Sequence, residues 1–280
     1  MAGTLFVVAT PIGNMDDISA RAVSVLQSVE LIAAEDTRHS GRLMSHYQIT
    51  TPLVAYHDHG SEVQGERIFA ALDAGQDVAL ISDAGTPLVS DPGYRLVRSA
   101  RERAYKVIPL PGACAAITAL SAAGLPSDRF CFEGFLPAKQ SQRRKALELL
   151  ASETRTLIFY EAPHRIIATV EDLIDLLGAE REVTLARELT KTYETVLNGN
   201  LSELLTQIKD DINQQKGEMV LVVRGFDGVE QSAQEQEEER VLKLLLVDLP
   251  LKQAAGLAAK ICGAQRNALY KKALVLKAGE

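Results

Sequence analysis

The chain contains the stretch Asp77-Val78-Ala79-Leu80-Ile81-Ser82-Asp83-Ala84-Gly85-Thr86-Pro87, a short apolar run followed by a turn that bears glycine and proline. A nearly continuous apolar run of this length is typical of a strand covered on both faces, as in a parallel sheet. Ligands bind such sheets beyond the carboxyl ends of the strands. The stretch therefore predicts an α/β fold, with a candidate ligand loop at residues 82–87.

Similar apolar runs alternate with helical segments on both sides of this stretch. We expect helix 20–29 to be capped by Ser19, helix 62–74 by Ser61, and helix 92–103 to open at Asp91 with Pro92 in its first position. Gly75 and Gly124 stand where helices should stop. This alternation predicts a largely parallel sheet with helices on both faces. Its strands are expected at 4–9, 31–34, 53–56, 77–82 and 106–110.

A second α/β unit follows the first. Two strand-like runs, 183–186 and 194–197, lie close together, which indicates a mixed sheet. The boundary between the units should fall after Gly124-Leu125-Pro126, so we expect an N-terminal domain over 1–127 and a second domain over 128–226. The remaining elements of the second unit are strands at 130–132, 156–160 and 219–223 and helices at 141–151, 164–177 and 201–212.

The charge of the C-terminal region changes sign along the chain. The net charge of −7 argues against nucleic-acid binding, but residues 226–240 hold six acidic residues against one arginine, and residues 241–280 hold seven basic against two acidic residues. We expect an acidic linker at 227–240, of which residues 227–239 could also be a frayed helix start, and a helical tail at 241–280, with a helix-turn-helix around Cys262-Gly263-Ala264. The tail is either a packing or oligomerisation element or a nucleic-acid contact, for which the candidates are Arg266, Lys271 and Lys272, beside Tyr270.

Other sequence features limit the cellular compartment and the kinds of reaction that this protein can catalyse. The three cysteines form no C-x-x-C pair, which argues against a disulfide framework or a zinc cluster. There is no apolar run of the roughly 18 residues that a membrane span needs, and the N-terminus lacks the pattern of a signal peptide. We therefore expect a cytoplasmic protein. Nucleotide-binding G-x-G-x-x-G and P-loop patterns, metalloprotease H-E-x-x-H and hydrolase G-x-S-x-G are all missing.

Three strand-to-helix loops are rich in small residues and proline. Small residues let a ligand approach the backbone closely, while proline fixes the loop. Each loop taken alone is also compatible with a plain turn, but three in one sheet favour a ligand site. The loops are Thr10-Pro11-Ile12-Gly13-Asn14, Ser82-Asp83-Ala84-Gly85-Thr86-Pro87 and Pro111-Gly112-Ala113-Cys114-Ala115-Ala116.

Polar clusters follow several strands. Glu35-Asp36-Thr37-Arg38-His39 suits a polar or phosphorylated substrate, or else Asp36 or Thr37 caps the next helix. His57-Asp58-His59 lacks a third metal ligand nearby and fits RNA contact or a surface loop better. The basic cluster Lys139, Arg143, Arg144 and Lys145 is either a solvated surface or a phosphate contact. Charged residues also follow the strands that end near Tyr160 and Ala186, which points to a cleft between the two domains.

The loops together resemble the tetrapyrrole methylase superfamily, and within it the members that modify ribosomal RNA. The resemblance covers nearly the whole chain. It rests on the three loops above and on Ala34-Glu35-Asp36-Thr37-Arg38, Phe135-Leu136-Pro137 and Lys216-Gly217-Glu218-Met219.

This resemblance implies two α/β domains with S-adenosylmethionine in the cleft between them, and a homodimer. The implied activity is 2′-O-methylation of one cytidine ribose in the decoding centre of 16S rRNA, with free rRNA or the assembled small subunit as substrate. No metal is implied. The cofactor contacts it implies are Pro11, Ser82, Asp83, Ala84, Thr86, Cys114, Ala115, Tyr160 or Glu161, and Ala186.

Methyl transfer to a ribose hydroxyl is mainly a matter of orientation, helped by a base or a cation. The candidate bases are Glu161 and Asp36, and the candidate electrostatic helpers are Lys139 and Arg187. Arg38 is the candidate phosphate holder. The RNA contacts expected besides Arg38 are Arg143, Arg144, Arg266, Lys271 and Lys272.

Two other functions remain open from the sequence. A C-methyltransferase for a tetrapyrrole precursor shares the loops but does not explain the basic tail. A DNA-binding regulator would use the helix-turn-helix to read DNA and the α/β body to sense a ligand.

Overall fold

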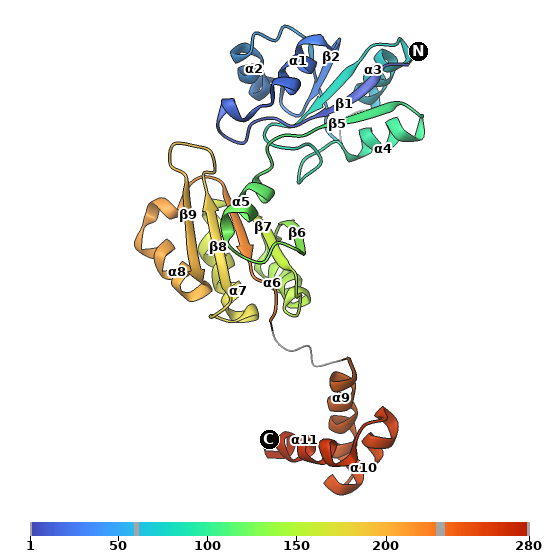
Figure 1. The fold of residues 1–280 in the computed structure, drawn as a ribbon, viewed down its shortest axis with the longest axis vertical. Helices are drawn as coiled ribbons and strands as arrows, with labels where there is room; N and C mark the ends of the chain where they lie inside the picture. Colours follow the sequence, from blue (N-terminus) through green and yellow to red (C-terminus); the bar gives the residue numbers. More distant parts are fainter. Residues whose placement is uncertain (1, 59–61, 228–232, 279–280) are drawn as a thin grey trace. The chain divides into compact units, whose positions relative to one another are not determined.

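The computed structural model describes residues 2–58, 62–227 and 233–278. The chain divides into two compact units, Met1–Phe226 and Asp227–Glu280 (Figure 1). In the described part of the chain, no helix combines the length and the apolar character needed to cross a membrane.

The first sheet is entirely parallel, as the apolar strand runs predict. Its strand order is β3-β2-β4-β1-β5, so β1 and β4 lie side by side at the centre. Every neighbouring pair in the sheet is parallel. The strands are β1 (Thr4–Val8), β2 (Leu31–Ala34), β3 (Leu53–Ala55), β4 (Val78–Ile81) and β5 (Lys106–Leu110).

Helices cover both faces of this sheet. Two apolar clusters separate the faces: one contains residues of α1 (Ala20–Ser28) and α2 (Thr37–His46), and the other contains residues of α3 (Glu62–Asp73) and α4 (Tyr94–Glu102). Successive residues of β4 alternate between the clusters, because Val78 and Leu80 belong to one and Ala79 and Ile81 to the other. This arrangement confirms the predicted three-layer order of helix, sheet and helix.

Of the predicted helix starts, one is confirmed and one is wrong. Ser19 caps α1, since its hydroxyl accepts a hydrogen bond from the backbone N–H of Ala22. Ser61 lies outside the described residues. The predicted start of the fourth helix at Asp91-Pro92 is wrong: α4 begins at Tyr94 with Gly93 as its N-cap at φ 128°. Ser90 also has a positive φ, which is incompatible with a helix. The chain therefore runs as a loop through Asp91 and Pro92 before α4 begins.

The second sheet is mixed, as expected. Its order is β6-β7-β10-β8-β9, and only the β6–β7 pair is parallel. The strands are β6 (Phe130–Phe135), β7 (Thr156–Glu161), β8 (Glu182–Arg187), β9 (Thr195–Asn200) and β10 (Met219–Val223), and the helices are α6 (Gln140–Leu150), α7 (Ile166–Leu177) and α8 (Leu201–Asp210).

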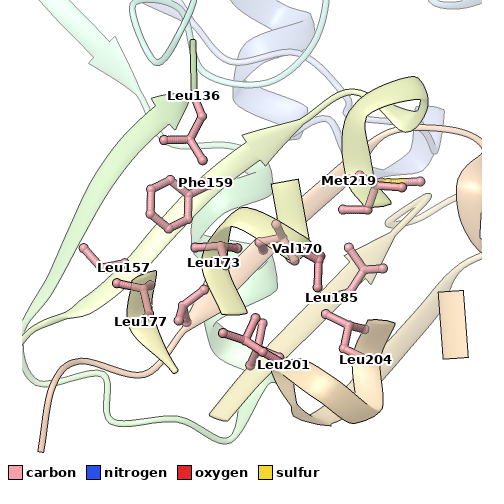
Figure 2. Packing of buried hydrophobic residues seen from close by; sticks show 14 of the residues in the cluster. Leu136, Leu157, Phe159, Val170, Leu173, Leu177, Leu185, Leu201, Leu204 and Met219 are labelled. Carbon is pink, nitrogen blue, oxygen red and sulfur yellow. The ribbon is translucent and has the colours of Figure 1, made fainter. Parts of the chain in front are cut away.

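The main core of the second unit lies between this sheet and its helices. Figure 2 shows Phe159 of β7 and Leu185 of β8 facing Val170 and Leu173 of α7, and Leu201 belongs to the same cluster. These side chains are fully buried. Burial of each such apolar side chain contributes about 1.5–3 kcal/mol to folding.

The opposite face of the second sheet is covered by α5 (Ala115–Ala123), which follows the last strand of the first sheet. Ala116 and Ala119 of this helix belong to one buried cluster with Ile158 of β7, Ala186 of β8 and Val220 of β10. Because alanine side chains are small, the helix lies close to the sheet. Gly124 ends it in the left-handed conformation at φ 66°, which confirms the predicted stop. The helix thus joins the two sheets into one unit.

The C-terminal unit is helical and has its own small core. Its helices are α9 (Ala233–Asp248), α10 (Leu251–Cys262) and α11 (Arg266–Ala278). Leu242 of α9, Ala258 of α10 and Leu269 of α11 are buried together. The turn after α10 carries Gly263 at φ 66°, as the helix-turn-helix pattern predicts. Helix α9 begins at Ala233, inside the acidic segment 227–240, which agrees with the alternative of a helix start there. Acidic residues in the first turns of a helix are compatible with the helix dipole.

Candidate active site

The three small-residue loops are tied together at one edge of the first sheet. Thr10 and Gly85 exchange backbone hydrogen bonds of 2.9 and 3.1 Å, so the loops after β1 and β4 pair with each other. The hydroxyl of Thr86 donates to the carbonyl oxygen of Ala113 at 2.9 Å and ties in the loop after β5. A Cβ on Gly112 would stand 2.6 Å from the Cβ of Ala9, so this approach requires glycine. The loops therefore form one rigid wall.

A cavity of about 360 Å³, here called the inter-sheet cavity, is lined by these loops and by the strand ends of the second sheet. Its walls are largely apolar, with Asp91 and Tyr160 as two of the few polar side chains. Its volume lies within the usual range of small-molecule pockets. It is lined by Ile12, Ala84, Gly85, Val89, Ser90, Asp91, Ala115, Phe135, Tyr160, Glu161, Ala162, Pro163, Ala186, Leu189, Gly217, Glu218, Met219 and Val220.

A second cavity of about 250 Å³, here called the α2 cavity, adjoins the first. The two share Ile12, Ala84 and Glu218 as lining residues. Helix α2 supplies one wall of the second cavity. The full lining is Thr10, Pro11, Ile12, Gly13, Met15, His39, Ser40, Arg42, Leu43, Ser82, Asp83, Ala84, Lys191 and Glu218.

Three carboxylates gather beside these cavities, at the ends of β2 and β4. The pKa of Asp91 is raised to about 6, mainly by burial and also by the nearby Glu35 and Asp83, against a hydrogen bond with Ser82 that lowers it. Burial and Asp83 also raise the pKa of Glu35. A site in which carboxylates resist ionisation favours a ligand that carries positive charge, because such a ligand relieves their repulsion.

Backbone strain is concentrated at the same place. Leu88, Ser90, Glu188 and Thr190 have φ values of 73°, 65°, 52° and 66°, in the region that side-chain-bearing residues rarely adopt. The first pair flanks Val89 and the second flanks Leu189, and both of these residues line the inter-sheet cavity. Such strain persists only where the surroundings enforce it, and it clusters at functional sites.

The structure divides the predicted cofactor residues into three groups. Ala84, Ala115, Tyr160 and Ala186 line the inter-sheet cavity. Pro11, Ser82 and Asp83 line the α2 cavity, as Ala84 also does. Thr86 and Cys114 line neither: Thr86 bonds to the neighbouring loop, and Cys114 is the N-cap residue of α5. Burial raises the pKa of Tyr160, whose hydroxyl accepts a hydrogen bond from the backbone N–H of Ala116 at 3.1 Å.

Glu161 contributes to the cavity wall, but its carboxylate is already occupied. One oxygen accepts hydrogen bonds from the backbone N–H of Ala162 at 2.7 Å and from Arg165 at 2.5 and 2.8 Å. The other accepts from the hydroxyl of Thr169 at 2.6 Å. The Glu161 side chain has no exposed surface. This geometry gives Glu161 a structural role and does not support it as a base.

Arg187 is likewise held inside the protein. Its guanidinium donates to Thr195 Oγ1 at 3.0 Å, Gln214 Oε1 at 3.1 Å and the carbonyl oxygen of Tyr193 at 2.8 Å. It lines neither cavity. The bonds fix the loop after β8 and leave Arg187 without a route to a substrate.

The other predicted catalytic and phosphate-binding residues lie on the surface near helix starts. Asp36 caps α2 and accepts from the backbone N–H of Arg38 at 2.8 Å, as the capping alternative predicts. The Arg38 guanidinium also pairs with Asp36 at 2.8 Å, and this hydrogen bond holds the pKa of Asp36 far below its usual range. Lys139 is the exposed N-cap residue of α6. None of the three lines either cavity.

The basic cluster of α6 is largely structural. Arg143, predicted to contact RNA, is only 3% exposed, and its Nε donates to Asp172 Oδ2 at 2.7 Å. That prediction is wrong, because a buried, paired guanidinium cannot reach a phosphate. Arg144 is one-third exposed and pairs with Asp172 and Asp175, each at 2.8 Å.

The predicted RNA contacts of the tail differ in their surroundings. Arg266 and Lys271 are exposed on α11. Lys272 pairs with Glu238 of α9 at 2.6 Å, so part of its charge holds the helical unit together.

Several lining residues escaped prediction from the sequence. The sequence predicts Asp91 as a helix cap, whereas the strained loop before α4 places it at the inter-sheet cavity. Phe135 and Gly217 stand within motifs that carried the resemblance, but no role was predicted for them. Arg42 and Ser40 have no local sequence signal and are brought to the α2 cavity by the helix.

Among the described residues, no group of three His, Cys, Asp or Glu side chains is placed to hold a metal ion. Of the His57-Asp58-His59 motif, His59 lies outside those residues. Asp58 accepts a hydrogen bond from the hydroxyl of Tyr56 at 3.2 Å.

Comparison with known proteins identifies relatives over nearly the whole length. Residues 4–205 match the family model of Tetrapyrrole (Corrin/Porphyrin) Methylases, and residues 232–277 match the RsmI C-terminal HTH domain. Ribosomal RNA small subunit methyltransferase I of Escherichia coli O157:H7 is 57% identical over 97% of this chain and 95% of its own length. The protein of the same name from Pseudomonas aeruginosa is 57% identical over 98% and 97%.

Solved structures agree on the fold. A uroporphyrin-III-C-methyltransferase from Thermus thermophilus aligns with a TM-score of 0.55 and 21% identity, over 79% of this chain and 94% of that one. The methyltransferase CobJ aligns with a TM-score of 0.59 and 18% identity, over 80% and 95%. These likenesses concern the two-sheet unit.

Proposed function

Because the chain belongs to the tetrapyrrole methylase family, and within it to the ribosomal RNA small subunit methyltransferase I group, we propose that it transfers a methyl group from S-adenosylmethionine to a ribose 2′-hydroxyl. The ribose is that of a cytidine in the decoding centre of 16S rRNA. The full-length relatives favour this function over a tetrapyrrole C-methyltransferase or a DNA-binding regulator, because their likeness extends through the C-terminal helices.

The inter-sheet cavity is the observation that carries the proposal. Ala84, Ala115 and Ala186 provide walls without bulky side chains, where a ligand can reach backbone groups. Ile12, Leu189 and Val220 offer an apolar slot suited to an adenine ring. S-adenosylmethionine supplies an electrophilic methyl group on a positively charged sulfonium. The carboxylate of Asp91, whose pKa is raised by burial, fits a cationic ligand of this kind.

The residues of this chain contribute mainly by positioning. Holding the two reacting atoms in a fixed orientation accounts for a large part of the rate enhancement, and no covalent intermediate with the protein is needed. The hydrogen bonds between the loops after β1, β4 and β5 keep one wall rigid. The apolar lining excludes water, which strengthens the attraction between carboxylate and cation.

RNA recognition requires surfaces outside the inter-sheet cavity, because the protein is acidic overall. We assign part of this recognition to the C-terminal unit, whose α11 exposes Arg266 and Lys271. The target nucleotide must be turned out of its surroundings to present its ribose.

The assembly and location belong to the same proposal. A homodimer follows from the family resemblance, and exposed apolar side chains such as Ile117 and Phe135 are compatible with a subunit interface. The cytoplasm follows from the ribosomal substrate.

Two measurements test the function. Mapping of 2′-O-methyl groups on ribosomal RNA from cells with and without the gene should show one 16S cytidine that loses its methyl group. Calorimetry with the purified protein should show binding of S-adenosylmethionine, and this binding should be lost when Ala186 is replaced by a bulky residue. An unchanged methylation map would reject the RNA substrate, and an absence of binding would reject the cofactor.

A further inference from the structure

The proposed function places the methyl donor in the inter-sheet cavity and assigns no role to the α2 cavity, although three of the implied cofactor contacts, Pro11, Ser82 and Asp83, line it. It adjoins the inter-sheet cavity at Ile12, Ala84 and Glu218, which line both. If the methyl donor occupies the inter-sheet cavity, an acceptor must meet it where the two cavities join. The lining of the α2 cavity therefore indicates what the acceptor is.

Arg42 is the cation available to an anion in this cavity. Its side chain is exposed on α2 and has no ion-pair partner within the described residues. Lys191 also lines the cavity but is already paired with Glu188 at 2.9 Å and Glu218 at 3.1 Å. Arg38, one helical turn earlier, is paired with Asp36 and lines neither cavity. The geometry thus favours Arg42 over Arg38 as the residue that contacts a phosphate.

Ser40 provides an independent sign of a ligand. It lines the α2 cavity and is 3% exposed, and its hydroxyl has no hydrogen-bond partner among the described residues. Buried polar groups nearly always have a hydrogen-bond partner. An unpartnered hydroxyl at a cavity wall therefore indicates that a bound molecule supplies the partner. A ribose or phosphate oxygen would supply it.

The other polar groups around the cavity suit a sugar phosphate as well. The side chain of His39 is exposed on the same helix as Arg42. Asp83 follows β4 and also lines the cavity, and one of its oxygens accepts the backbone N–H of Asp36 at 3.0 Å. A carboxylate can accept a further hydrogen bond from a sugar hydroxyl.

We propose that the α2 cavity binds the acceptor ribonucleotide, with Arg42 on its phosphate and Ser40 and Asp83 on its sugar. The 2′-hydroxyl then points to the shared wall at Ala84. This inference rests on the proposed function and names the subsite within it. Arg42 and Ser40 act on the substrate only, so the methyl donor binds without them.

The test compares the variants Arg42→Gln, Arg42→Lys and Ser40→Ala with the control Arg101→Gln. Arg101 is an exposed arginine of α4 that lines neither cavity. Binding of a short single-stranded fragment of 16S rRNA that contains the methylated cytidine is measured at several salt concentrations. Loss of one phosphate contact lowers the slope of log affinity against log salt by about 0.7. We expect this change for Arg42→Gln, no change for Arg101→Gln, and recovery for Arg42→Lys.

Kinetics on isolated small subunits supply the second readout. We expect Arg42→Gln and Ser40→Ala each to raise the KM for the subunit by about tenfold, with an unchanged Kd for S-adenosylmethionine. The thermal midpoint of Ser40→Ala should not fall, because the Ser40 hydroxyl has no hydrogen-bond partner among the residues that the structure describes. This stability readout separates substrate binding from a structural role.

The outcomes distinguish the two levels of the argument. A wild-type protein that does not methylate rRNA overturns the proposed function. A wild-type protein that methylates, with variants indistinguishable from Arg101→Gln, overturns the acceptor subsite alone. A loss of cofactor affinity with an unchanged salt slope also overturns it, because the cavity would then belong to the methyl donor.

Discussion

Replacement of Asp172 by alanine should strongly destabilise the two-sheet unit. Asp172 is 1% exposed and accepts hydrogen bonds from Arg143 at 2.7 Å and Arg144 at 2.8 Å. The side chain of Arg143 is 4% exposed, so the variant leaves its charge buried without a carboxylate partner and with only a 3.4 Å hydrogen bond to the carbonyl oxygen of Ala138. Removing one partner of a buried ion pair costs about 3–5 kcal/mol, because the remaining charge cannot be solvated.

The loss is measurable by thermal and chemical denaturation. For a unit of this size, a loss of that magnitude lowers the melting temperature by about 10 °C. The matched control is Asp175→Ala: Asp175 pairs with the same Arg144, but its side chain is 60% exposed, so water replaces the lost contact. The double variant Arg143→Met, Asp172→Leu should recover most of the stability, since it removes both charges.

The effect should also depend on pH. Burial raises the pKa of Asp172, but the hydrogen bonds from Arg144, Arg143 and Gln140 outweigh it, and the pKa lies below its usual value. The ionised carboxylate therefore stabilises the fold fully above the unfolded pKa of about 3.9, and this contribution declines as pH falls through the lower folded pKa. Equal losses for Asp172→Ala and Asp175→Ala at pH 7 would refute the reasoning.

Three further predictions follow from the site and the tail. Glu161→Gln should lower the unfolding free energy by about 1–3 kcal/mol, because it disturbs the bonds to Arg165 and Thr169, yet leave the shape of the pH–rate profile unchanged; loss of the fall in rate at low pH would instead identify Glu161 as the base. The affinity for S-adenosylmethionine should fall below pH 6, where Asp91 becomes protonated, and calorimetry should show this dependence vanish in Asp91→Asn; a dependence that persists in the variant would assign it elsewhere. A protein ending at Phe226 should keep its folded core and its cofactor affinity but lose rRNA methylation, since the buried clusters of the two units are separate; normal methylation would make the tail a packing element.

Local signals were sufficient wherever a single segment decides its own structure. The apolar runs predicted the parallel strands β1, β2, β4 and β5. The reason is clearest for β2 and β4, which are buried at every position, because a strand covered on both faces must be apolar throughout. Ser19 and Gly124 marked helix ends, because capping depends on neighbouring backbone groups. The start of α4 was missed because Gly93, two residues beyond Asp91, decides where the helix begins.

The candidate site shows the opposite case. The small-residue loops were recognised from the sequence because close backbone approach restricts residue type locally. The roles of charged side chains were not recognised, because an arginine in a sequence has the same appearance whether it is buried or exposed. Arg143 and Arg187 point into the protein and are neutralised or bonded there, whereas Arg42 lines a cavity and has no ion-pair partner in the described part of the chain.

Patterns within short segments were enough to predict the fold class, the edge of the first sheet at which the cavities lie and the helical tail, since each depends on local periodicity and turn chemistry. The tertiary structure alone decided which polar groups face the cavities. The partners of a side chain come from distant segments: Asp172 reaches Arg143 across 29 residues, and Asp83 reaches Asp36 across 47. Burial and pairing of charges are properties of those long-range contacts, and no local pattern contains them.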